Sequence, residues 1–438
     1  MSVSDGTGVD KGSRQGPTIP LMDQLVSSQN MRAAYEQVYG NKGAAGIDGM
    51  KVTELRPYLH KNWSRIKQEL LTGQYYPQAV KSVKIPKPSG GERELGIPTV
   101  VDRLIQQALH QVLQPLYEPQ FSDHSYGFRP QRSAHQALKK AQGYIREGRR
   151  YVVDIDLSKF FDEVHHTRLL SKLRMRIEDK RVIHLIDRYL RAGMMRDGVE
   201  EKRLKGTPQG SPLSPLLSNI VLDELDQELA KRGLRFVRYA DDLQIYVKTK
   251  RSAERVMTSV SNFIAQRLRL KVNEKKSAIG RPWDRDFLGY SFTMDKMTKL
   301  KPAKSSLKRL KGKVKEKFRK GKGRNLGLFI LDDLNPLMKG WIYYFGLSET
   351  RGFAKDLDSW LRRRLRKVRW QQWKRPWTRM QELMRRGLRE EQAVQSAFNQ
   401  RGPWWNAGAS HMNRAYPKQY FDRIGLINLE HQLNYLNR

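Results

Sequence analysis

Apolar and polar residues follow two different periods along the chain. Apolar residues spaced three and four positions apart predict amphipathic helices. These helices are expected over residues 21–38, 53–72, 101–118, 133–146, 167–175, 179–192, 216–231 and 252–268. Runs rich in β-branched and aromatic residues predict strands over residues 80–85, 92–98, 151–157 and 235–248, with short strands or turns at 270–277 and 286–292. The pattern is helical again from residue 298 to about 390, so an α+β region is expected to precede an all-helical one.

The stretch Arg235–Val247 predicts a hairpin with two adjacent carboxylates, Asp241 and Asp242, at a bend that lacks glycine. Side chains alternate faces along a strand, but a tight turn breaks this alternation and lets at least one aspartate reach a shared centre. Two carboxylates held together repel each other unless a cation lies between them, and carboxylates are ligands that Mg²⁺ prefers. A surface turn without function is the alternative interpretation. A third carboxylate is needed to decide.

The strand over residues 151–157 supplies this carboxylate. It is apolar except for Asp154 and Asp156. Aspartates on one face of a buried strand are costly unless they are ligated or paired. Asp156, near the carboxyl end, is the predicted metal ligand, and Asp154 is expected to have a structural or supporting role. An edge strand with both aspartates in solvent is the alternative, which fits poorly with the apolar neighbours.

The charge balance points to a polyanionic partner. The chain of 438 residues has 83 Lys and Arg against 45 Asp and Glu, a formal net charge of +38. Such an excess causes self-repulsion, and a nucleic acid partner explains it. No apolar run reaches the ~18 residues of a spanning helix, so no membrane partner is expected. The absence of cysteine excludes disulfides and thiolate zinc sites. No signal peptide is visible, so the cytoplasm is the expected location.

Two loops carry candidate substrate contacts. The hairpin over residues 80–98 carries Lys87 and Arg93, and basic side chains on a hairpin suit a triphosphate. A solvated basic edge is the alternative. The loop over residues 205–215 is rich in Gly, Pro and Ser, which favour a fixed irregular backbone before the next helix. It places the uncharged Gln209 at the helix entrance.

The helical region after residue 298 is strongly basic, with interleaved aromatic residues. Such faces suit phosphate contacts together with stacking on unpaired bases. The alternative is that tryptophans form the core of a helical bundle, and we favour it for most of them. The basic residues that we single out for nucleic acid binding are Lys308, Arg309, Lys311, Arg362 and Arg363.

A strand ending in Asp156, a Pro-Gln-Gly loop and the Tyr239-Ala240-Asp241-Asp242 hairpin, in this order, resemble the core of reverse transcriptases. The chain resembles most closely the reverse transcriptase/maturase encoded by bacterial group II introns. Further motifs similar to this family are Ala44–Gly49, Ile85–Pro88, Leu95–Thr99, Asp102-Arg103, Ser125–Pro130, Gly206–Pro215, Leu334–Pro336 and Gly340–Phe345. The resemblance covers roughly residues 31–410.

The resemblance implies a right-hand polymerase of α+β class, with fingers and an antiparallel-sheet palm followed by an α-helical thumb/maturase domain. Asp156, Asp241 and Asp242 would be the catalytic residues and bind two Mg²⁺ ions, which clamp the attacking 3′-hydroxyl and the leaving pyrophosphate. The implied partners are an RNA template, group II intron RNA, a DNA primer or target, and dNTPs. The implied function is RNA-directed DNA synthesis together with splicing and retromobility of the intron.

The resemblance also implies the residues that contact the dNTP. Lys87 and Arg93 would hold the triphosphate. Phe161 would stack against the deoxyribose and exclude a 2′-hydroxyl. Gln209 would contact the incoming nucleotide, and Lys276 would contact the phosphates as product forms.

The expected divisions are a disordered tail (1–20), an N-terminal extension with fingers (21–100), a fingers/palm core (101–297), the thumb/maturase domain (298–400) and a short C-terminal segment (401–438) interpreted as a remnant of a DNA-binding region. Many relatives carry a C-terminal His-Asn-His endonuclease, but this chain ends soon after the maturase segment. Second-strand cleavage is therefore not expected. The alternatives are a related enzyme that serves the host in DNA repair or defence, and a splicing-only, RNA-binding maturase.

Overall fold

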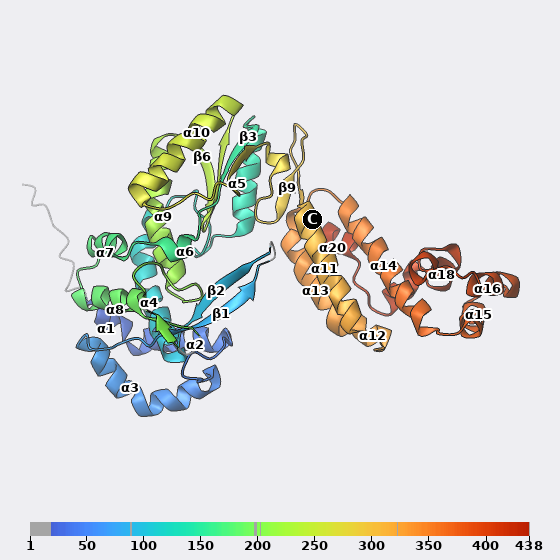
Figure 1. Cartoon of the computed structure of the whole chain (residues 1–438), viewed down its shortest axis with the longest axis horizontal. Coiled ribbons are helices and arrows are strands. Elements are labelled where there is room, and N and C mark those ends of the chain that lie inside the picture. Colours follow the sequence, from blue (N-terminus) through green and yellow to red (C-terminus); the bar gives the residue numbers. More distant parts are fainter. Residues whose placement is uncertain (1–18, 88–89, 197–198, 202, 322, 438) are drawn as a thin grey trace, which may run out of the picture. The chain divides into compact units, whose positions relative to one another are not determined.

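The computed structural model describes residues 19–87, 90–196, 199–201, 203–321 and 323–437 (Figure 1). Residues 1–18 of the predicted disordered tail lie outside the described residues. The chain divides into two compact units. Unit 1 comprises residues 1–133, 155–245 and 254–278, and unit 2 comprises residues 134–154, 246–253 and 279–438. The predicted domain boundaries remain predictions.

Helices make up most of unit 1. They are α1 (Leu21–Leu25), α2 (Ser28–Gly40), α3 (Leu55–Leu71), α4 (Val100–Tyr117), α6 (Phe160–Glu163), α7 (His166–Arg174), α8 (Lys180–Arg191) and α9 (Ser214–Lys231). Helix α10 (Lys250–Phe263) crosses the division between the units and continues as a π-helix, Ile264–Leu268. The predicted helices of unit 1 are present, with ends shifted by a few residues, but the single helix expected over residues 21–38 is two helices, α1 and α2, separated at residues 26 and 27.

Helix α4 shows why this sequence folds as it does. Thr99 caps its first turn by accepting a hydrogen bond from the backbone N–H of Asp102, as Ser and Thr do at helix starts. One face of the helix is buried, including Leu104 and Leu109. The buried Asp102 carboxylate accepts hydrogen bonds from the Tyr75 hydroxyl at 2.8 Å and the Thr99 hydroxyl at 2.7 Å. These bonds offset the cost of burying a carboxylate and fix the segment before α4.

The predicted hairpin over residues 80–98 is confirmed as β1 (Val80–Pro86) and β2 (Glu92–Ile97), which pair antiparallel with Ile85 opposite Arg93. The sheet continues with β4 (Met194–Arg196), parallel to β1, and β5 (Val199–Glu201), antiparallel to β4, in the order β2-β1-β4-β5.

A second sheet has the order β6-β7-β3-β8. Its strands are β3 (Tyr151–Ile155), β6 (Arg235–Tyr239), β7 (Asp242–Val247) and β8 (Ala278–Gly280). Figure 1 labels β3 and β6. The predicted strands at 151–157 and 235–248 are thus confirmed. The region 270–277 is a turn, from which Val272 forms a single bridge with Leu157. The short strand expected over residues 286–292 is present as β9 (Tyr290–Phe292), which pairs antiparallel with β10 (Leu300–Pro302) in unit 2.

Unit 2 is mainly helical. Its helices are α5 (Ala134–Arg146), α11 (Lys304–Lys320), α12 (Leu326–Leu328), α13 (Asn335–Tyr344), α14 (Gly352–Gln372), α15 (Pro376–Arg385), α16 (Glu390–Ala397), α17 (Pro403–Asn406), α18 (Ser410–Ala415), α19 (Lys418–Arg423) and α20 (Leu429–Leu436). A π-helix, Phe329–Leu334, joins α12 to α13. No helix among the described residues is long and apolar enough to cross a membrane.

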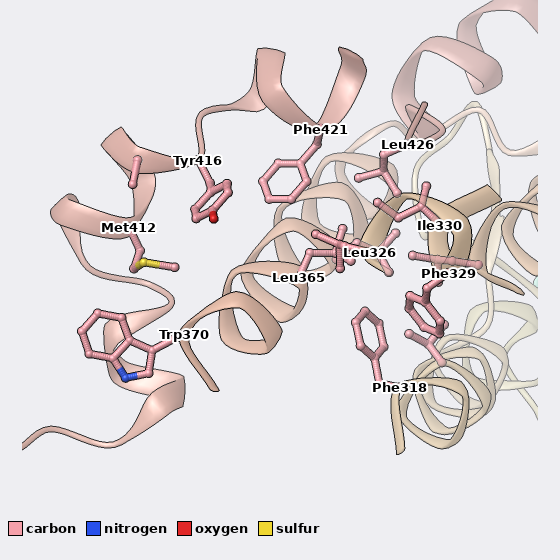
Figure 2. Packing of buried hydrophobic residues seen from close by; sticks show 14 of the residues in the cluster. Phe318, Leu326, Phe329, Ile330, Leu365, Trp370, Met412, Tyr416, Phe421 and Leu426 are labelled. Atoms are coloured by element: carbon pink, nitrogen blue, oxygen red, sulfur yellow. The ribbon is translucent and has the colours of Figure 1, made fainter. Parts of the chain in front are cut away.

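One hydrophobic core holds the helices after residue 304 together. Figure 2 shows Phe318 beside Phe329, with ring centroids 5.0 Å apart, and the side chains of Tyr416 and Phe421 in the same cluster. Trp370 and Trp373 are buried in it, and Trp341 and Trp360 pack against it. The interpretation of most tryptophans as core residues is confirmed. The exceptions are Trp377, Trp404 and Trp405, which are 64%, 37% and 50% exposed.

Candidate active site

The bend between β6 and β7 carries the adjacent aspartates. Strand β6 ends at Tyr239 and β7 begins at Asp242, so Ala240 and Asp241 form the connection. Ala240 has φ +57°, the positive φ that the first position of a tight hairpin turn requires. This conformation is uncommon for alanine, so the surrounding structure must hold it.

Gly127 supports the bend from outside the sheet. A Cβ atom at Gly127 would lie 3.0 Å from the carbonyl carbon of Tyr239, and closer still to the nitrogen of Ala240. The backbone of the Ser125–Pro130 motif therefore touches the hairpin, and only glycine permits this approach.

A buried ion pair holds the bend from inside. Arg238 and Asp226 have side chains that are 1% and 0% exposed, and Arg238 Nε donates to Asp226 Oδ1 at 2.8 Å. The same guanidinium donates from Nη1 to the carbonyl of Ala240 at 2.9 Å and to Asn219 Oδ1 at 3.0 Å. Asn219 Nδ2 in turn donates to the carbonyl of Gly127 at 2.9 Å. The network is fully satisfied and connects both backbone segments that position Asp241.

Asp156 follows directly after β3, and the 271–277 turn holds it. Its backbone N–H donates to Ser277 Oγ at 3.0 Å, and Asn273 Nδ2 donates to its Oδ1 at 3.0 Å. Lys276 Nζ lies 3.4 Å from Asp156 Oδ2. Sequence reasoning missed Asn273 and Ser277, since no local pattern pairs this turn with the end of β3. Asp154 forms an ion pair with Arg285 at 2.7 Å, which agrees with a structural role.

The charge of Asp156 acts on the carboxylate of Asp241. Burial, followed by the nearby charge of Asp156, raises the pKa of Asp241, while Arg93 and Lys276 act in the opposite direction. A divalent cation would relieve this repulsion.

Asp242, the third predicted ligand, is exposed. In the part of the chain that the structure describes, no three His, Cys, Asp or Glu side chains gather closely enough to hold a metal ion. The structure thus brings two of the three predicted ligands together. Two carboxylates still fit Mg²⁺, which takes one or two together with water and substrate phosphates.

A cavity of about 490 Å³ in unit 1 brings together three predicted nucleotide contacts, Arg93, Phe161 and Gln209. Lys87 and Lys276 are not among its lining residues. Arg103 lines it as well, and its Nη2 donates to the carbonyl of Ala44 at 2.7 Å. Arg103 lies in a motif quoted above for its family resemblance, but nothing in the local pattern marked it as a cavity residue.

The predicted nucleic acid contacts of unit 2 lie on α11 and α14. Lys308 and Arg309 are exposed, whereas Lys311 and Arg362 are half-buried. Lys311 Nζ lies 5.7 Å from the centroid of the Trp360 ring. The Arg363 guanidinium lies 4.3 Å from the centroid of the Trp404 ring and donates to the Trp404 carbonyl at 3.0 Å.

Comparison with known families gives two matches. Residues 85–292 match the family described as reverse transcriptase (RNA-dependent DNA polymerase). Residues 307–387 match the family described as group II intron, maturase-specific domain. The chain is 32% identical over 299 residues to Protein YkfC of Escherichia coli (strain K12), covering 59% of this chain and 78% of that protein.

The chain belongs to the family of group II intron-encoded reverse transcriptases and maturases. A second relative within it, the group II intron-encoded protein LtrA of Lactococcus lactis subsp. cremoris, is 40% identical over 206 residues. That match covers 47% of this chain and 34% of LtrA, so the chain spans about a third of its length. A solved structure, a partial Cas6-RT-Cas1–Cas2 complex, matches 57% of this chain and 43% of its own, at 22% identity and a TM-score of 0.37. The family matches confirm the resemblance to reverse transcriptases and group II intron maturases.

Proposed function

We propose that the chain is an RNA-directed DNA polymerase that extends a DNA primer on an RNA template, and that it also binds group II intron RNA and assists splicing and retromobility. One observation carries the polymerase proposal. Arg93 lines a cavity with Phe161 and Gln209, and the charges of Arg93 and Asp156 both act on Asp241.

Each acidic side chain has a proposed role in the chemistry. The primer 3′-hydroxyl attacks the α-phosphorus of the dNTP, and pyrophosphate leaves. Asp156 and Asp241 would hold Mg²⁺, with Asp242 as a third ligand, and two bound ions would neutralise the charge that develops on the attacking and leaving oxygens. The Arg238 network holds the bend of Asp241, and the 271–277 turn holds Asp156. Such positioning matters because phosphoryl-type transfer depends mainly on geometry and charge.

The cavity residues have proposed roles in nucleotide selection. Arg93 offers a planar fork to the triphosphate, and Lys87 and Lys276 offer point charges. Phe161 would stack on the deoxyribose and exclude a 2′-hydroxyl, and Gln209 would hydrogen-bond the incoming nucleotide. The half-buried Phe161 and Gln209 both line the cavity, which supports a shared substrate.

We also propose that the chain has the right-hand architecture of polymerases. The β2-β1-β4-β5 sheet corresponds to fingers, the β6-β7-β3-β8 sheet to the palm, and the helices after residue 304 to a thumb/maturase domain. The exposed basic residues of α11 and the cation–aromatic pairs of α14 support contacts with RNA phosphates and unpaired bases.

Primer extension tests the proposal. Purified protein, Mg²⁺, dNTPs and a DNA primer annealed to RNA should yield extended product, and the Asp241→Ala, Asp242→Ala double variant should yield none. The exposed Asp295→Ala variant is the control for loss of a carboxylate elsewhere. If the intact protein binds RNA tightly without extending a primer, the splicing-only maturase replaces the polymerase proposal.

A further inference from the structure

The loop Lys205–Ser211, here called the Gln209 loop, is tied to two other substrate-binding elements of unit 1. The carbonyl of Gln209 accepts a hydrogen bond from the backbone N–H of Gly96 at 2.9 Å, and Gly96 belongs to β2, the strand of Arg93. On its other side, the backbone N–H of Thr207 donates to the carbonyl of Phe161 at 2.6 Å. The loop therefore connects the backbone segments that carry Arg93, Phe161 and Gln209, which all line the cavity.

Gly206 brings the loop backbone against Phe161 without intervening space. It has φ +89°, and a Cβ atom there would lie 2.9 Å from the carbonyl oxygen of Phe161 and 2.9 Å from Cα of Asp162. Its N–H donates to the carbonyl of Val164 at 2.8 Å. A shift of Gly206 would therefore be transmitted directly to the backbone that carries the Phe161 ring, because close-packed backbones leave no slack.

His166, the first residue of α7, holds this contact. The residue is 4% exposed, and its Nε2 lies 2.7 Å from the carbonyl oxygen of Gly206. A carbonyl only accepts, so Nε2 carries the proton. Burial lowers the pKa of His166, which favours the neutral ring. Its Nδ1 is buried and has no hydrogen-bond partner among the described residues. The imidazole thus acts as a single buried donor to one carbonyl.

We propose that His166 is a positioning residue for nucleotide selection: its hydrogen bond to Gly206 fixes the Gln209 loop against Phe161 and so sets how strictly ribonucleotides are excluded. The inference rests on the proposed function, in which Phe161 excludes the 2′-hydroxyl. Steric exclusion changes steeply with distance, so a displacement of a fraction of an ångström at Phe161 affects rNTPs more than dNTPs.

The decisive comparison is between His166→Gln and His166→Asn. Both place an amide at a buried site, but the longer Gln carries its N–H₂ group near the position of Nε2, whereas the Asn amide ends near Nδ1 and cannot reach Gly206. Single-nucleotide incorporation gives kcat/KM for a dNTP and for the matching rNTP. We expect His166→Asn to lower the dNTP/rNTP selectivity about tenfold, mainly through faster rNTP use, and His166→Gln to retain most of it.

The neighbouring His165 is exposed, so His165→Asn is the matched control and should leave selectivity unchanged. A purely structural role would lower both kcat/KM values together, and that result would overturn the proposal. So would unchanged selectivity in His166→Asn, or failure of both amide variants to fold. Phe161→Val separates the two claims. If it loses selectivity while His166→Asn does not, only the inference fails; if it keeps selectivity, the proposed role of Phe161 fails.

Discussion

Two arginines, Arg238 in unit 1 and Arg363 in unit 2, have different environments. In unit 1, Arg238 is completely buried and paired with Asp226. It also donates hydrogen bonds to the Ala240 carbonyl and to Asn219. In unit 2, Arg363 is half-buried and lies over the ring of Trp404. The first arrangement fixes one backbone geometry, because the buried guanidinium is hydrogen-bonded to Asp226, Asn219 and the Ala240 carbonyl at once. The second keeps a cation and an aromatic ring near the surface, as binding to phosphates and bases requires.

Replacing Arg238 should produce the largest effect. Arg238→Met leaves Asp226 buried without its cation, so we expect a loss of about 3–5 kcal/mol in the free energy of unfolding. Adding Asp226→Leu should recover most of this stability, because neither charge is then left unpaired. The double variant should still incorporate dNTPs about 100-fold more slowly, since the Ala240 carbonyl has lost its donor.

Urea denaturation and primer extension on the same samples measure the two quantities separately. Full recovery of activity in the double variant would show that the buried pair contributes stability alone. That result would contradict the role of Arg238 in positioning the bend, on which its contrast with Arg363 depends.

A glycine pair tests the same contrast on the backbone. Gly127→Ala places a Cβ against Tyr239 and Ala240, so we expect a loss of about 100-fold in dNTP incorporation as the bend shifts. Gly143, inside α5 of unit 2, has nothing within 4 Å of an added Cβ. Gly143→Ala should therefore stabilise the protein by about 0.5–1 kcal/mol, because alanine is the better helix former. Steady-state extension rates and thermal melts of both variants test these expectations. If Gly127→Ala and Gly143→Ala extend primers at the same rate, the proposed role of Gly127 is contradicted.

The same contrast explains what could be predicted from the sequence. Local patterns were sufficient for the hairpin of Asp241, the strand before Asp156 and the β1–β2 hairpin with Arg93, since each depends on neighbours in the chain. The supports of these residues come from distant segments. Asn273 and Ser277 reach Asp156 across more than 100 residues, and no spacing rule marks such a partner.

The sequence also could not divide the chain as the structure does. Residues 134–154, which include α5, belong to unit 2 although they lie between two segments of unit 1 in the sequence. Arg146 of α5 donates to the carbonyl of Thr298 at 2.8 Å, a contact that tertiary packing alone determines. Composition does not indicate this interleaving, because the shift in charge and helicity comes only near residue 298.

The contributions of two carboxylates, Glu94 and Asp358, to the free energy of unfolding should change with pH in opposite directions. Hydrogen bonds from Arg196 lower the pKa of Glu94 in unit 1 to about 2. Its stabilisation is therefore present above the ordinary value of 4.5 and is lost as the pH falls toward 2. Burial raises the pKa of Asp358 in unit 2 above 3.8. Its contribution is present at low pH and is lost as the pH rises through the raised value.

Urea denaturation between pH 2 and pH 7 measures these signs. Glu94→Gln should be less stable than the wild type at pH 7, by at most about 1 kcal/mol because the Arg196 pair is partly exposed, and the difference should vanish near pH 2. Asp358→Asn should gain stability relative to the wild type as the pH rises. Parallel pH profiles for the two variants would contradict the assignment.

The smallest effect is expected on the surface of unit 2. Arg363→Gln should change the free energy of unfolding by less than about 1 kcal/mol, but weaken RNA binding about threefold and reduce the slope of log affinity against log salt by about 0.7–0.9. Arg385→Gln, whose side chain is 75% exposed and paired with Glu382, removes the same charge and should leave the salt slope unchanged. Filter binding at four salt concentrations measures both. If the two variants reduce affinity equally, net charge alone accounts for binding, and the Arg363–Trp404 pair has no specific role in it.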